Sequence, residues 1–126
     1  MRILIVDDRP DVGFLMTNLI AQIGHEACVA TSGSAAVRLV AELPPDVVLL
    51  DIQMPGLNGY ETARRLRDRY GRQFPIFAVT ADPVDISLAH QCGFDGIFAK
   101  PFSVMKLTAL VSQLEKQNRG CQPAAW

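Results

Sequence analysis

The stretch Val47-Val48-Leu49-Leu50-Asp51-Ile52-Gln53-Met54-Pro55-Gly56 decides the fold of this chain. Four apolar residues lead to a single carboxylate, Asp51, and Pro55 and Gly56 then turn the chain. A short run rich in Val and Leu between turn residues is typical of a strand buried on both faces of a parallel sheet. In open α/β sheets, ligands bind just beyond the carboxyl ends of such strands. Asp51 therefore stands where a reactive group is expected.

Other short apolar runs precede and follow this strand, and they alternate with segments of helical periodicity. The predicted strands are 3–6, 26–30, 47–50, 75–80 and 96–99, and the predicted helices cover 11–23, 36–43, 60–70, 84–92 and 104–114. Five strand–helix pairs in alternation predict a parallel sheet with helices on both faces and right-handed connections. We expect a three-layer α/β/α, flavodoxin-like doubly wound sheet in the order 2-1-3-4-5, with its switch point between the first and third strands.

Length and composition limit the class of protein. The chain has 126 residues, 49% hydrophobic and 20% charged, which predicts one globular domain with a substantial core. A net charge of −1 predicts no direct binding to nucleic acid or to anionic membrane. No apolar run approaches the roughly 20 residues of a membrane span. Three widely spaced cysteines indicate neither a disulfide framework nor a zinc site, so a cytoplasmic location is expected.

The predicted topology brings polar side chains together at the carboxyl ends of four strands. These are Asp7 and Asp8, Asp51, Thr80 and Lys100. Two like charges about 4 Å apart repel by roughly 4 kcal/mol at an effective dielectric near 20. Three neighbouring carboxylates therefore require a cation or a raised pKa, and carboxylates with water suit Mg²⁺, or Mn²⁺, as the bound metal.

The same set of groups suits the chemistry of a phosphoryl group. A metal ion and Lys100 would neutralise phosphoryl oxygens, and the Thr80 hydroxyl would donate a hydrogen bond to one of them. An aspartate carboxylate can be the covalent nucleophile in such a transfer. Asp51 is the candidate because it stands alone at the centre of the predicted sheet.

With these residues in place, the sequence resembles the receiver domains of two-component response regulators. The motifs that carry the resemblance are Val6-Asp7-Asp8, Asp51-Ile52-Gln53-Met54-Pro55-Gly56 with Asn58-Gly59, Val79-Thr80-Ala81 and Phe98-Ala99-Lys100-Pro101-Phe102. They stand in the family's order and at compatible spacing. The resemblance covers residues 1–117, so we expect a receiver domain over 1–117 and a tail or linker over 118–126.

The resemblance implies a role for each site residue. Asp51 would accept a phosphoryl group from a histidine kinase or a histidine phosphotransfer protein, so that the chain is a signalling switch with self-phosphorylation and self-dephosphorylation as its only chemistry. Asp8 and Asp51 would bind Mg²⁺ directly, Asp7 would act mostly through water, and Gln53 would add its backbone carbonyl. Thr80 and Lys100 would contact phosphoryl oxygens. The family usually has a cis peptide before the proline at position 101, Pro101, which would aim the lysine into the site.

Readout is where the sequence departs from the family. Family members couple a shift of the threonine to rotation of an aromatic residue three positions before the lysine, and Ile97 occupies that position here. Strand alternation places Phe98 on the opposite face, so Phe98 is expected to be core. The segment from Ala81 to Gly93 is expected to move, and Asp82 is expected to modulate the lifetime of the phosphoryl group.

Partners follow from the resemblance too. Besides the kinase or phosphotransfer protein, an output domain or effector protein is expected to read the switch, and a homodimer would use helix 4, strand 5 and helix 5. Two alternatives stay open. One is a phosphohydrolase of the haloacid dehalogenase type, although its Asp-x-Asp nucleophile would lie on the first strand, where this chain has adjacent Asp7 and Asp8. The other is a degenerate receiver that is never phosphorylated and acts only as an interaction module.

Two local expectations concern helices. Asp11 is expected to cap the first helix, because aspartate side chains accept hydrogen bonds from the first turn. The basic cluster Arg64, Arg65, Arg67 and Arg69 is expected to form a solvated helix face.

Overall fold

The computed structural model describes residues 1–81, 83–99, 106 and 108–114, and its strands form one parallel sheet. The strand order is β2-β1-β3-β4-β5, as predicted. The strands are β1 (Arg2–Val6), β2 (Glu26–Ala30), β3 (Val47–Leu50), β4 (Ile76–Thr80) and β5 (Gly96–Ala99). The helices are α1 (Pro10–Gln22), α2 (Gly33–Glu42), α3 (Gly59–Tyr70) and α4 (Ile86–Cys92), and residues 106 and 108–114 are also helical.

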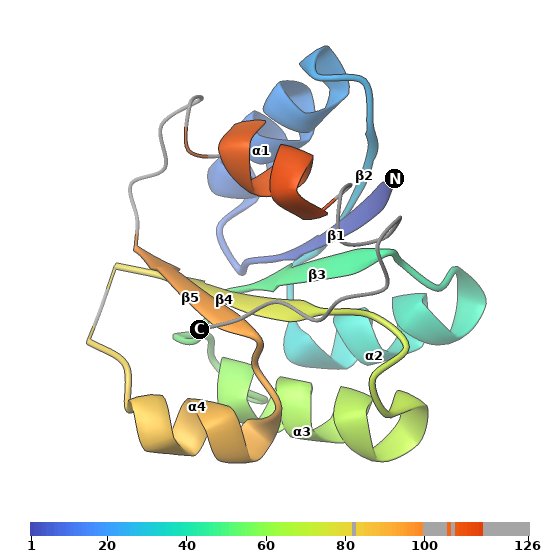
Figure 1. Ribbon diagram of the computed structural model, residues 1–126. Coiled ribbons are helices and arrows are strands. Elements are labelled where there is room, and N and C mark those ends of the chain that lie inside the picture. Colours follow the sequence, from blue (N-terminus) through green and yellow to red (C-terminus); the bar gives the residue numbers. More distant parts are fainter. Residues whose placement is uncertain (82, 100–105, 107, 115–126) are drawn as a thin grey trace.

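Helices cover both faces of this sheet, which confirms the three-layer α/β/α fold (Figure 1). One face carries α1 and the helical residues 108–114, and the other carries α2, α3 and α4. Two apolar clusters fill the layers. Met16, Ile20 and Leu110 pack with Ile3 and Leu49 on the α1 side. The cluster on the α2–α4 side is larger, with these members among others: Val6, Ala36, Val40, Leu50, Ala63, Leu66, Ala89 and Phe94.

The central strand is buried throughout, as the opening stretch predicts. All four residues of β3 are buried, and its neighbours are β1 and β4. The register pairs Val6 with Leu50 across β1 and β3. Asp7 and Asp51 consequently follow two paired residues at the same edge of the sheet. The fold therefore brings two of the predicted acidic residues together through backbone pairing alone.

The expectation that Asp11 caps the first helix is wrong. The N-cap of α1 is Arg9, which makes no side-chain capping hydrogen bond, and Pro10 follows at the first helical position. Asp11 lies inside the first turn of α1, because proline favours that first position and moves the helix start forward. At the start of α3, Asn58 is the N-cap and forms a reciprocal capping box with Glu61.

Some predictions lie outside the described residues. These are the roles of Asp82, Lys100 and Pro101, and the tail over 118–126. Among the helices of the described residues, none is long and apolar enough to cross a membrane.

Candidate functional site

Three carboxylates meet at the carboxyl edge of the sheet. One oxygen from each of Asp7, Asp8 and Asp51 lies within 4.8 Å of the other two. Asp7 and Asp51 are buried, with exposed fractions of 2% and 6%, whereas Asp8 is half-buried and opens the cluster to solvent. Oxygen donors on two rigid strand ends, with one side open, fit the preference of Mg²⁺ for a few carboxylates and several waters.

The turn after β1 fixes the position of Asp7. Its backbone N–H donates to the carbonyl of Ala30 at 3.1 Å, which continues the β1–β2 ladder by one residue. Its Oδ1 accepts a hydrogen bond from the backbone N–H of Arg9 at 3.0 Å, and the Arg9 Nε lies 3.8 Å away. Arg9 thus offsets part of the negative charge of the cluster at the point where α1 begins.

Backbone contacts hold Asp51 in the same way. Its N–H donates to the Val6 carbonyl at 2.9 Å, which joins the ends of β3 and β1. Its Oδ1 accepts from the backbone N–H of Gln53 at 3.2 Å. These contacts close a tight turn after β3 and aim the carboxylate at the cluster, while the Gln53 side chain is exposed.

Gly59 allows α3 to begin directly against this turn. Its N–H donates to the Ile52 carbonyl at 2.9 Å. A Cβ at position 59 would meet the carbonyl oxygen of Asp51 and would lie 2.6 Å from the Ile52 Cα, which is closer than real Cβ atoms approach. Glycine is therefore required here for the close approach of two backbones, and the first turn of α3 rests on the backbone of Asp51.

Thr80 ends β4 at the same edge of the sheet, and its exposed fraction is 3%. It pairs with Ala99, which precedes Lys100 in the sequence. Ala81, which follows Thr80, is exposed. The described residues thus bring together Asp7, Asp8 and Asp51, with Thr80 at the end of the neighbouring strand.

Strand β5 has the alternation that the sequence predicts. Ile97 packs against the core cluster on the α2–α4 side, and Phe98 packs against the cluster on the α1 side. The Phe98 ring lies 5.4 Å from the Phe77 ring, centroid to centroid. Phe98 is therefore not displaced toward α4, although it is half-buried rather than fully enclosed.

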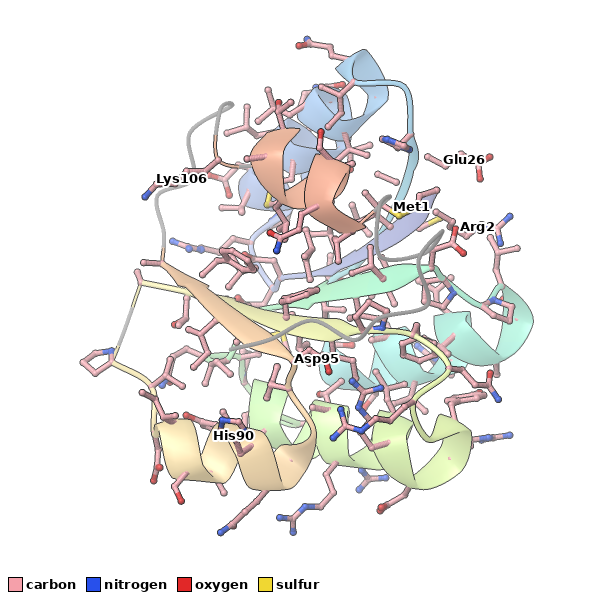
Figure 2. The ribbon with its side chains drawn as sticks, in the orientation of Figure 1. Met1, Arg2, Glu26, His90, Asp95 and Lys106 are labelled. Atoms are coloured by element: carbon pink, nitrogen blue, oxygen red, sulfur yellow. The ribbon has the colours of Figure 1, made fainter. Side chains whose placement is uncertain are left out.

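Sequence reasoning missed a second charged group, at the opposite edge of the sheet. Asp95 precedes β5 and is buried, and it accepts hydrogen bonds from Arg67 Nη2 at 2.6 Å, Arg72 Nη1 at 3.0 Å and the Ile76 backbone N–H at 2.8 Å. Figure 2 labels Asp95 where it lies between the sheet and α3. Arg67 therefore does not belong to the solvated face, and its side chain is only 11% exposed.

Arg67 also binds three backbone carbonyls. It donates to Gly93 through Nε at 2.8 Å, and to Gly71 at 3.0 Å and Phe74 at 2.6 Å through Nη1. Burial lowers the pKa of Arg67 below its ordinary value, and the charge of Asp95 opposes this shift. One side chain thus fastens the end of α3 to the end of α4 and to the start of β5. The only signal for it in the sequence was an isolated Asp95 before a strand.

The comparisons with known proteins agree with this geometry. The family model described as the response regulator receiver domain matches residues 3–112. The chain belongs to this family. It is 37% identical, over 117 residues, to the DNA-binding response regulator MtrA of Mycolicibacterium smegmatis, a match that covers 93% of this chain and 51% of that protein. The chain thus spans about half the length of the curated relatives that it matches.

Two similar solved structures were determined with beryllofluoride. The response regulator TrrA of Thermotoga maritima, in complex with Mg²⁺ and beryllofluoride, has a TM-score of 0.81 and 31% identity over 90% of this chain and 97% of that chain. The beryllofluoride-activated N-terminal receiver domain of RstA from Klebsiella pneumoniae has a TM-score of 0.83 and 29% identity over 93% and 100%. The receiver assignment, its signalling role and the doubly wound fold are therefore confirmed, and no comparison supports the phosphohydrolase alternative.

Proposed function

We propose that Asp51 is the phosphoacceptor of this receiver, with Mg²⁺ held by Asp8 and Asp51 directly, by Asp7 through water and by the Gln53 carbonyl. The observation that carries this proposal is the cluster of three carboxylates around the end of β3. Mg²⁺ offsets their repulsion and the charge of an incoming phosphoryl group. Thr80 and Lys100 donate to the phosphoryl oxygens, and Pro101 orients the lysine. Ala81, Asp82 and Ile97 modulate the readout and the lifetime of the phosphoryl group.

The transfer moves the phosphoryl group without a further reagent. A carboxylate oxygen of Asp51 attacks the phosphorus of a phosphohistidine, the N–P bond breaks, and the histidine nitrogen takes up a proton. In self-dephosphorylation, the oxygen of a water molecule attacks the phosphorus, the bond between phosphorus and the Asp51 oxygen breaks, and the products are the free Asp51 carboxylate, inorganic phosphate and a proton. Response regulators receive their phosphoryl group from histidine kinases, and we propose a histidine kinase or a phosphotransfer protein as the donor here.

Incubation with acetyl phosphate tests this function directly. With Mg²⁺ present, the chain is expected to gain the mass of one phosphoryl group, and chelation of the metal with EDTA is expected to prevent the gain. The gain in mass is measured by intact-protein mass spectrometry, and peptide mapping locates the phosphoryl group on Asp51. A wild-type chain that stays unmodified under these conditions would establish the degenerate receiver instead.

An exposed apolar surface beside the site suits a protein donor. Phe14 and Leu15 lie on α1, one turn beyond its start next to the acidic cluster, and they are 71% and 59% exposed. Neighbouring large apolar side chains that are exposed on a soluble protein mark interaction sites more often than isolated ones do. We propose that the donor docks on this face of α1 while its phosphohistidine reaches Asp51.

Phe14→Ala is expected to lower the rate of phosphoryl transfer from a phosphorylated histidine phosphotransfer protein by about tenfold, the effect of losing one aromatic anchor. Transfer from acetyl phosphate should keep its wild-type rate, because that donor needs no docking surface. Ile86→Ala is the matched control, since Ile86 is 60% exposed on α4. An equal loss of both transfers in Phe14→Ala would assign Phe14 to folding.

We propose that the output of the switch is read by an output domain or by an effector protein. DNA binding is part of the printed name of the MtrA relatives, which is in tension with the expectation of no direct nucleic-acid contact. We assign any DNA contact to sequence outside the matched half, with the receiver ending near residue 117. A homodimer would use α4, β5 and the helix after it, where a cavity of about 350 Å³ lies between Ile97, Phe98 and Lys106.

A further inference from the structure

Tyr60 joins the two segments that leave the phosphorylation site. It follows Gly59, whose backbone rests on Asp51 and Ile52, so its place is set by the turn after β3. Its hydroxyl accepts a hydrogen bond from the backbone N–H of Asp85 at 3.2 Å. Asp85 is the N-cap of α4 and stands five residues after Thr80 along the chain. One hydrogen bond thus joins the segment that follows β3 to the segment that follows β4.

The ring of Tyr60 is held independently of its hydroxyl. It packs edge-on against Phe94, with 6.3 Å between ring centroids and an interplanar angle of 89°, and Phe94 is buried. It also packs against the same core cluster as Ile97 and Leu88 of α4. The ring is therefore held in place by packing, and the hydroxyl is the part of the side chain that can gain or lose a hydrogen-bond partner.

The two ends of α4 are fastened very unequally. At the start, within the part of the chain that the structure describes, α3 contributes the exposed hydrogen bond from Asp85 to Tyr60. At the end, Arg67 binds the Gly93 carbonyl from a buried position, and Gly93 has a left-handed φ of 94° that terminates the helix. A helix of seven residues held in this way is fixed more firmly at its Gly93 end than at its start.

We propose that Tyr60 is a positioning residue of this receiver, whose hydroxyl holds the start of α4 until Asp51 is phosphorylated. The inference rests on the proposed function of Asp51. A phosphoryl group adds three acceptor oxygens, which attract the Thr80 hydroxyl and the segment that follows it toward Asp51. Asp85 ends that segment, so the same movement draws its N–H away from Tyr60. This hydrogen bond links Asp51 to α4 without an aromatic residue at position 97, where this chain has Ile97.

Tyr60→Phe removes the hydroxyl and keeps the ring, so it isolates this link. Loss of one net hydrogen bond changes an equilibrium by roughly two- to tenfold. Because the bond opposes the phosphorylated conformation, Tyr60→Phe is expected to bind beryllofluoride, in the presence of Mg²⁺, more tightly than wild type by about that factor. Amide hydrogen exchange at Asp85 is expected to be faster in the variant, and beryllofluoride should accelerate it in wild type but add little in the variant.

The second tyrosine of the chain supplies the control. Tyr70 is the last residue of α3, at the opposite end of the helix from Tyr60, and it packs on Phe74. Tyr70→Phe therefore removes the same hydroxyl group at a position away from the start of α4. Beryllofluoride affinity and Asp85 exchange that are the same in Tyr60→Phe, Tyr70→Phe and wild type would overturn the role of Tyr60. Failure of wild type to bind beryllofluoride would instead overturn the proposed function.

Discussion

Asp51→Asn is expected to abolish phosphorylation by acetyl phosphate and to stabilise the metal-free protein. The amide has no nucleophilic carboxylate, so no acyl phosphate forms at position 51. The second effect follows from the three carboxylates, whose oxygens lie within 4.8 Å of one another. Two such charges 4.8 Å apart repel by about 3 kcal/mol at an effective dielectric near 20. Asparagine removes this repulsion and keeps the shape of the side chain.

The gain in stability should be smaller than that Coulomb term. Arg9 already lies 3.8 Å from Asp7, and Asp8 is partly solvated, so both reduce the repulsion. A rise of about 1–2 kcal/mol in the free energy of unfolding is expected with EDTA, from urea titration at neutral pH. Added Mg²⁺ should stabilise wild type more than Asp51→Asn, because the variant has lost one charged ligand, and the difference between them should shrink.

Asp68→Asn is the matched control, since Asp68 is an exposed carboxylate on α3, outside the cluster. It should keep normal phosphorylation and change the free energy of unfolding by less than about 0.5 kcal/mol. Phosphoryl incorporation in Asp51→Asn equal to that in wild type would place the acceptor on another residue. Equal stabilisation by the two variants would show that the carboxylates at the site do not repel one another appreciably.

The strands and the acidic cluster were predictable from sequence because their signals are local. Residues 26–30, 47–50 and 96–99 were predicted with the bounds that the structure has, since each run is mostly apolar and is followed by polar or turn residues. Once the strand order is 2-1-3-4-5, β1 and β3 are neighbours, and their terminal aspartates meet without further information. The pairing of parallel strands positions the acidic residues. The site could therefore be predicted without knowledge of long-range contacts between side chains.

What the sequence could not predict depends on contacts between distant side chains. The hydroxyl of Tyr60 accepts a hydrogen bond from Asp85, which stands 25 residues away. Asp11 was assigned as a cap on residue type, whereas Pro10 determined where α1 starts. Arg67 has arginines around it on the outer face of α3, and its partner Asp95 stands 28 residues away. Helical periodicity predicts the face of the helix on which a residue lies. It does not predict where the long side chain of an arginine places its guanidinium group.

Arg67→Met is expected to destabilise the chain by about 3 kcal/mol, because it leaves the buried carboxylate of Asp95 without its closest partner. Four hydrogen bonds of the guanidinium are lost with it, to Asp95 and to the carbonyls of Gly93, Gly71 and Phe74. Methionine preserves most of the aliphatic packing. The remaining ion pair with Arg72 offers little compensation, since the Arg72 side chain is 68% exposed and its pairing is screened by solvent.

In thermal unfolding this loss corresponds to a midpoint lower by about 10 °C for a domain of this size. Arg65→Met is the control: Arg65 is exposed on the same helix, and its replacement should move the midpoint by no more than about 2 °C. Arg67→Lys should recover only part of the loss, because an ammonium cannot bind a carboxylate and three carbonyls in the planar geometry of a guanidinium. Equal destabilisation by Arg65→Met and Arg67→Met would reduce the Arg67 contacts to ordinary helix packing. A large difference would show that the Arg67 contacts stabilise the chain, and one of these contacts holds Gly93 at the end of α4.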